Sequence, residues 1–78
     1  MISVKSKNEA IKKLQEFKAT VGLYKKNKKG RALLARDIKE SILFLKKYSV
    51  EESVVSLIIK EKQEKLDAFI LRNKEGGD

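Results

Sequence analysis

The sequence predicts an all-α fold, a three-helix bundle that forms one domain over residues 1–78. Three observations support this prediction. Apolar residues recur at helical spacing in three segments, capping-box patterns precede two of them, and the chain has no proline to interrupt them. The expected helices span residues 6–24, 31–47 and 50–73, and the last is the longest.

The first expected helix begins at Ser6, because Ser6 and Glu9 have the capping-box spacing. Gly22 allows two positions for the C-terminal end of this helix. The helix either ends in a left-handed cap at Gly22 or continues to about Tyr24, and the unbroken apolar spacing favours continuation. Residues 1–5 are expected to form an extended lead-in. The apolar face of this helix consists of Ala10, Ile11, Leu14, Phe17, Val21 and Tyr24.

The second expected helix has more apolar surface than one neighbour can cover. Leu33 and Phe44 lie off its main stripe, and Leu43 lies on a third side. We therefore expect this helix to be the central element, in contact with both others. Leu33 and Phe44 are then either covered by the lead-in or part of a protein interface. The main stripe consists of Leu34, Ala35, Ile38, Ile42 and Leu45.

The third expected helix follows a second capping-box pattern, Ser49 and Glu52. Residues 54–59 are rich in β-branched side chains, but the cap before them and the helix-forming residues after them favour a helix. Lys62 falls within the apolar stripe, and we expect its stem to lie on the core while its ammonium reaches water. The alternative is a buried lysine with a shifted pKa. The stripe consists of Val55, Ile58, Ile59, Leu66, Phe69 and Ile70.

Positive charge is concentrated in the first half of the chain, although the net charge is +8. Residues 1–39 hold 12 Lys/Arg and 3 Asp/Glu, whereas residues 40–78 hold 7 Lys/Arg and 8 Asp/Glu. Five of the seven residues in the turn 25–31 are basic. This pattern predicts an anionic partner for one end of the molecule, the alternative being a turn whose charges only meet solvent. The candidate nucleic-acid-binding residues are Lys25, Lys26, Lys28, Lys29 and Arg31, extended by Lys12, Lys13 and Arg36.

The composition argues against an enzyme. The chain has no histidine and no cysteine, so the commonest general base and the commonest zinc ligands are missing. The clustered carboxylates, such as Glu61 and Glu64, are explained by capping and surface ion pairs. We therefore expect no catalytic residue, metal or cofactor. No apolar run approaches the length of a membrane span, so a cytoplasmic location is the default expectation.

Several short motifs occur together along most of the chain: Lys28-Lys29-Gly30-Arg31, Leu33-Leu34-Ala35-Arg36, Val50-Glu51-Glu52, Lys60-Glu61-Lys62-Gln63 and Ala68-Phe69. In these motifs the sequence resembles the N-terminal helical part of the GatB/YqeY family. The resemblance implies a helical module related to the tail of the tRNA-dependent amidotransferase, which contacts tRNA. It implies nothing about catalysis in this chain.

Two functions from different classes are consistent with the sequence. The first is binding of nucleic acid, RNA slightly ahead of DNA, through the basic turn, which predicts a steep dependence on salt. The second is a protein-interaction module, such as a small regulator or inhibitor, which predicts sensitivity to apolar substitutions. Self-association as a homodimer belongs to this second class. The candidate protein-interface residues are Leu33, Phe44, Phe69, Ile70 and Leu71.

Overall fold

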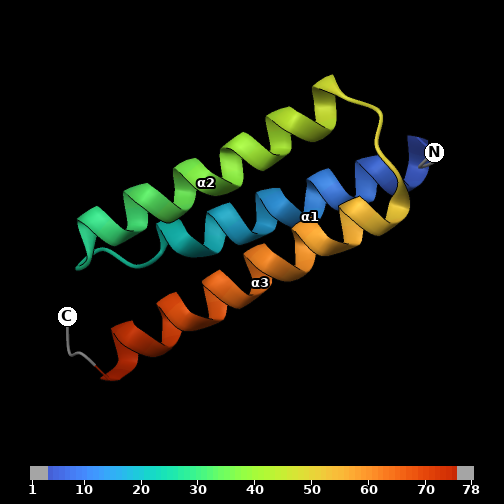
Figure 1. Ribbon diagram of the computed structural model, residues 1–78. Helices are drawn as coiled ribbons and strands as arrows, with labels where there is room; N and C mark the ends of the chain where they lie inside the picture. The colour runs from blue at the N-terminus through green and yellow to red at the C-terminus, as the bar shows by residue number, and fades with distance from the viewer. Residues whose placement is uncertain (1–3, 76–78) are drawn as a thin grey trace.

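The computed structural model describes residues 4–75 as three helices joined by two short loops. The helices are α1 (Val4–Gly22), α2 (Lys28–Lys47) and α3 (Glu52–Glu75). They lie side by side in an elongated molecule of 43 × 17 × 15 Å, with α2 and α3 flanking α1 (Figure 1). The predicted all-α, three-helix arrangement with a long last helix is confirmed for the described residues.

A single apolar core runs between the three helices. The buried positions of each helix are those that the periodicity of the sequence predicts, and Leu14, Val21, Ile38 and Leu45 are fully buried. Side chains at the edges of the stripes, including Tyr24, Ile58 and Ile70, are partly buried against this core. The core consists of Ala10, Ile11, Leu14, Phe17, Val21, Leu34, Ile38, Ile42, Leu45, Val55, Leu66 and Phe69.

The central helix is α1, so the expectation that the second helix would be central was wrong. The two other helices each pack more extensively on α1 than they do on one another. The additional apolar side chains of α2 that suggested a central position, Leu33, Leu43 and Phe44, remain exposed. In this protein, apolar side chains on several sides of a helix therefore do not indicate that several helices pack against it.

The first helix begins and ends earlier than predicted. Val4 and Lys5 are already helical, so Ser6 lies inside α1 and not at its cap, and residues 1–3 of the expected lead-in lie outside the described residues. At the other end α1 stops at Gly22 and does not continue to Tyr24. The backbone closes there in a tighter turn, in which the N–H of Tyr24 donates to the carbonyl of Val21 at 3.1 Å.

The second helix begins at Lys28, three residues before the predicted start. Asn27 is its N-cap: the Asn27 side-chain oxygen accepts a hydrogen bond from the Gly30 N–H at 3.1 Å. The Asn27 carbonyl accepts the first intrahelical bond, from the Arg31 N–H at 2.9 Å. A Cβ on Gly30 would lie 2.6 Å from the Asn27 amide nitrogen, so glycine leaves room for the capping side chain.

The third helix begins at Glu52, and its cap is Glu51 and not Ser49, which corrects the predicted boundary. The Glu51 carbonyl accepts hydrogen bonds from the Val54 and Val55 N–H groups, both at 3.1 Å. The carboxylates of Glu51 and Glu52 suit the positive end of the helix.

Candidate nucleic-acid interface

The loop between α1 and α2, together with the first turn of α2, forms one strongly basic end of the molecule. We define this basic end as Lys25, Lys26, Lys28, Lys29 and Arg31. Its four lysines are exposed, and Arg31 is partly buried. None of the five forms an ion pair with a carboxylate among residues 4–75. The basic end therefore presents uncompensated positive charge to solvent.

Two of these lysines occupy positions that are unfavourable for the helix. Lys28 and Lys29 lie in the first turn of α2, which contains no acidic residue. The N-terminus of a helix has the equivalent of about half a positive charge, so lysines there are repelled by the helix and by one another. A local arrangement that opposes stability is typical of a functional site.

Arg31 also holds the loop in place. Its guanidinium Nη1 donates a hydrogen bond to the backbone carbonyl of Tyr24 at 3.0 Å, across seven residues. This bond ties the first turn of α2 to the start of the loop that follows α1. Arg31 therefore fixes the backbone that positions the four lysines, in addition to contributing charge.

The three outlying candidates do not join the basic end. Lys12 and Lys13 lie near the middle of α1, and Lys13 is about 14 Å along the helix from Gly22. Lys13 lines a small groove between α1 and α3 that also contains acidic residues. Arg36 is paired with Glu40, its Nε lying 3.3 Å from a carboxylate oxygen. The structure thus groups five of the eight sequence-predicted residues.

The candidate protein-interface residues are also divided. Leu33 is 60% exposed and Leu71 is 55% exposed, and Phe44 is exposed with its ring 5.1 Å from that of Tyr48. Phe69, in contrast, is 7% exposed and belongs to the core, so its assignment to a surface interface is corrected. The Phe69 ring packs edge-on against that of Tyr24 at 5.5 Å between centroids. Ile70 is partly buried against the same core.

A groove of about 370 Å³ lies between the start of α2 and the end of α3. Leu33 and Phe69 are among its apolar lining residues, and Asp37, Lys65 and Arg72 are among its polar ones. Arg72 was not among the predicted site residues, because 41 positions separate it from Arg31 in the sequence. α3 runs antiparallel to α2 (Figure 1), and Arg72 and the N-cap Asn27 line the same groove.

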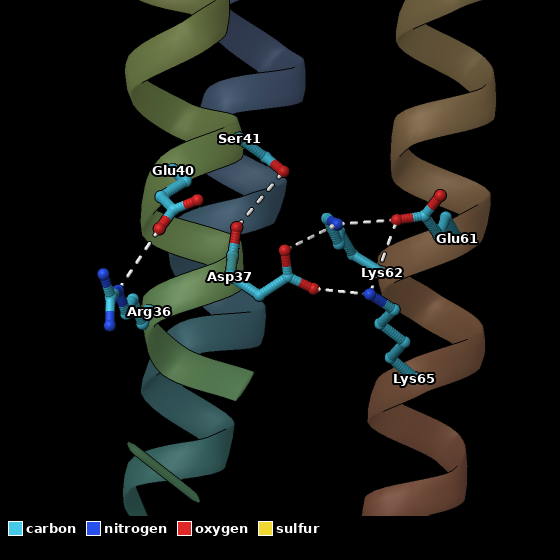
Figure 2. Close-up of polar contacts among 7 residues, drawn as sticks. All are labelled: Arg36, Asp37, Glu40, Ser41, Glu61, Lys62 and Lys65. Atoms are coloured by element: carbon cyan, nitrogen blue, oxygen red, sulfur yellow. Dashed lines mark hydrogen bonds and ion pairs between the residues drawn. The ribbon is translucent and has the colours of Figure 1, made fainter. Parts of the chain in front are cut away.

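Four charged residues connect α2 to α3 near the middle of the bundle (Figure 2). The Lys62 ammonium lies 3.1 Å from an Asp37 carboxylate oxygen and 2.7 Å from one of Glu61. Lys65 binds the other Asp37 oxygen at 2.6 Å and lies 3.6 Å from Glu61. Lys62 is only 5% exposed, so the prediction that its ammonium reaches water was wrong. Its charge is instead met by two carboxylates, the usual condition for burying a charge.

The cluster shifts the pKa values of three of its members. Partial burial acts to raise the pKa of Asp37, but hydrogen bonds from Lys65 and Lys62 outweigh it and lower that pKa below its ordinary value. The hydrogen bond from Lys62 lowers the pKa of Glu61. The hydrogen bond to Asp37 raises the pKa of Lys65. The cluster therefore favours the charged form of these three groups, which is the behaviour of a structural link between helices.

Among residues 4–75 no group of three or more histidine, cysteine or carboxylate side chains is arranged to hold a metal ion. No described helix is both long enough and apolar enough to cross a membrane. No protein-family model, curated protein or solved structure matches the chain.

Proposed function

We propose that this protein is a nucleic-acid-binding module that contacts phosphate groups through its basic end, with RNA, in particular tRNA-like RNA, ahead of DNA. The observation that supports the proposal most strongly is the pair Lys28 and Lys29. Both are exposed, unpaired and located at the positive end of α2, where they destabilise the helix unless an anion is present. A phosphate group in front of this turn removes that repulsion and releases counterions from the nucleic acid.

The mode of binding follows from the packing of Tyr24, the aromatic residue that precedes Lys25 in the loop. Tyr24 packs edge-on against Phe69, so its ring is committed to the core and cannot serve as a platform for a base. We therefore propose contact with the backbone of structured nucleic acid and not stacking on a single strand. The preference for RNA rests on the resemblance to the GatB/YqeY family, which implies a relation to the tail of the tRNA-dependent amidotransferase, and that tail contacts tRNA.

An electrophoretic mobility assay with tRNA and with duplex DNA, repeated across a salt series, tests the proposal. The wild-type protein should bind both, tRNA more tightly, with affinity that falls steeply as salt rises. Replacing Lys28 and Lys29 with glutamine should weaken binding to every sequence and flatten the salt slope by about 1 to 2 units. The helix should tolerate both changes, since both side chains are exposed.

Arg36→Gln and Glu40→Gln together provide a control, because this variant removes one exposed ion pair and leaves the net charge unchanged. It should bind as the wild-type protein does. Unchanged binding in the Lys28→Gln/Lys29→Gln variant would exclude the basic end as the contact surface.

A second candidate function, binding to a protein partner or to a second copy of the chain, is favoured by one observation. Leu33 on α2 and Leu57 on α3 are 60% and 66% exposed, and Leu33 lines the groove between these two helices. Sedimentation equilibrium at high micromolar concentration tests self-association. A dimer mass that Leu33→Ser and Leu57→Ser abolish would support it, whereas a monomer mass throughout would exclude it.

A further inference from the structure

We propose that the groove between α1 and α2 is a second phosphate-binding surface for the same nucleic acid. This inference rests on the proposed function and extends it from one end of the molecule along one face. The groove has a volume of about 500 Å³. Lys18 lines it from α1, and Lys39 and Lys46 line it from α2. Ala19, Ile42 and Leu43 supply the apolar part of its lining.

The lining of this groove contains no carboxylate, which distinguishes it from three other grooves of the molecule. The groove at the start of α2 contains Asp37, that along the middle of α3 contains Glu61 and Glu64, and that between α1 and α3 contains acidic residues from both helices. A phosphate group approaching any of these three is repelled by a neighbouring carboxylate. In the α1–α2 groove the charged side chains of the lining are all lysines.

The three lysines are also free of ion pairs. Lys18, Lys39 and Lys46 are exposed, and none has a carboxylate partner among the described residues. An unpaired lysine can neutralise a phosphate without first breaking an existing salt bridge. Each such contact adds a counterion-release contribution to binding.

The spacing along α2 suits a nucleic-acid backbone. Lys39 and Lys46 are separated by seven residues, which is close to two helical turns, so they lie on one face about 10 Å apart. Along the axis of a B-form duplex that distance corresponds to about three base-pair steps, at about 3.4 Å per phosphate of one strand. Lys18 stands on the opposite wall, so a strand lying in the groove is contacted from both helices.

The groove and the basic end belong to the same pair of helices. The two helices that form it are joined by the loop that carries Lys25 and Lys26 (Figure 1). From Lys28 to Lys46 the surface along α2 extends over about 27 Å, or roughly eight base pairs of duplex. A single nucleic acid can therefore contact both surfaces at once.

Salt-dependent binding of tRNA, measured by fluorescence anisotropy, tests the groove with charge-matched variants. Lys39→Gln should flatten the salt slope by about 0.7 to 0.9 units, and Lys39→Gln/Lys46→Gln by about twice that amount. The matched control is Lys60→Gln, which removes one exposed charge from α3 beside Glu61 and Glu64. It should change the slope by much less than Lys39→Gln does. Thermal unfolding of each variant confirms that it is folded.

The outcomes separate this inference from the proposed function. If Lys28→Gln/Lys29→Gln flattens the salt slope and Lys39→Gln/Lys46→Gln does not, binding at the α1–α2 groove is excluded and binding at the basic end is supported. If the wild-type protein does not bind tRNA or duplex DNA, both proposals are overturned. If the groove variant binds tRNA normally but loses binding to poly-glutamate, the groove takes an acidic protein segment instead, which also overturns the inference.

Discussion

Asn27 is the residue that determines where the basic end becomes helical. Its side-chain oxygen satisfies the Gly30 N–H, and glycine at that position leaves space for it. Because the first turn of α2 contains lysines and no acidic residue, this cap is the main local interaction that offsets their repulsion. Lys28 and Lys29 are thus held in a defined turn.

Replacing Asn27 with alanine should therefore destabilise the protein by about 0.5–2 kcal/mol, as measured by urea unfolding. Asn27→Asp should cost less, because a carboxylate keeps the acceptor and adds a favourable charge at the helix N-terminus. Ser49→Ala should change the free energy of unfolding by no more than about 0.5 kcal/mol, since Ser49 does not cap α3. A larger loss for Ser49→Ala than for Asn27→Ala would contradict this description of the two caps.

Removing a carboxylate partner of Lys62 and removing Lys62 itself should have different effects on stability. Asp37→Asn leaves the buried ammonium with Glu61 alone and should cost about 1–2 kcal/mol, because solvent at the exposed side of Asp37 screens part of the loss. Lys62→Met places an apolar side chain of similar length in an apolar stripe, and leaves both carboxylates with Lys65. Its stability should stay within about 1 kcal/mol of the wild type. Equal losses of unfolding free energy in the two variants, measured by urea unfolding, would show that the Lys62–Asp37 ion pair itself stabilises the protein.

At the scale of the elements, α3 is held to α2 by the charged cluster and to α1 by the core. This arrangement gives the α2–α3 contact a defined dependence on pH. The pKa values of Asp37 and Glu61 are lowered in the folded protein, so their contribution to stability is present above the unfolded pKa of about 4 and is lost as pH falls through the folded values. The raised pKa of Lys65 acts at the alkaline end, where its contribution is lost as pH rises through the folded value.

The difference in stability between the wild-type protein and Asp37→Asn should therefore be largest near about pH 7 and should shrink by about pH 3. Urea unfolding of both proteins at the two pH values measures it. A difference that stays constant with pH would mean that the Asp37 carboxylate does not act through its charge.

The end of α3 contains a buried and an exposed apolar residue, Phe69 and Leu71. Phe69 lies in the core against Tyr24, so Phe69→Ala should destabilise the protein by about 3–5 kcal/mol. Leu71→Ala, at an exposed position of the same turn, should cost less than about 1 kcal/mol. The sedimentation mass should be the same for Phe69→Ala and the wild type. A change of mass with little loss of stability would place Phe69 at an interface between copies.

The existence of the helices and the core positions could be predicted from the sequence, because burial follows the period of an α-helix and the stripes of Leu14, Ile38 and Leu66 express that period directly. The starts of helices could not, because Ser6 and Ser49 have capping-box spacing without capping, whereas Asn27 caps without a box. The identity of the central helix could not be predicted either, because it depends on which helix faces pack against one another in the folded protein.

The candidate site was predictable only in part. The basic turn is a run of neighbouring residues and is visible in the sequence. Its charges have no carboxylate partner among residues 4–75. The Asp37 partner of Lys62 is 25 positions away. Arg72 lines the same groove as Asn27, and Lys18 lines the same groove as Lys39 and Lys46, only because the helices pack antiparallel. No local spacing reports such pairs.

As a whole, the molecule is a narrow bundle almost three times as long as it is thick, with a cluster of basic residues at one end and three lysines lining the groove between α1 and α2. We propose that nucleic acid binds to that end. The chain contains no proline, so almost every residue contributes a backbone amide signal to a nitrogen–proton NMR spectrum. Addition of tRNA to the labelled protein maps the contact surface residue by residue. We predict that the largest changes fall on residues 25–31 and weaken with added salt. Binding at the basic end would be contradicted by changes centred on Leu33, Leu57 and Leu71 instead. It would also be contradicted by the absence of changes at equimolar tRNA in low salt.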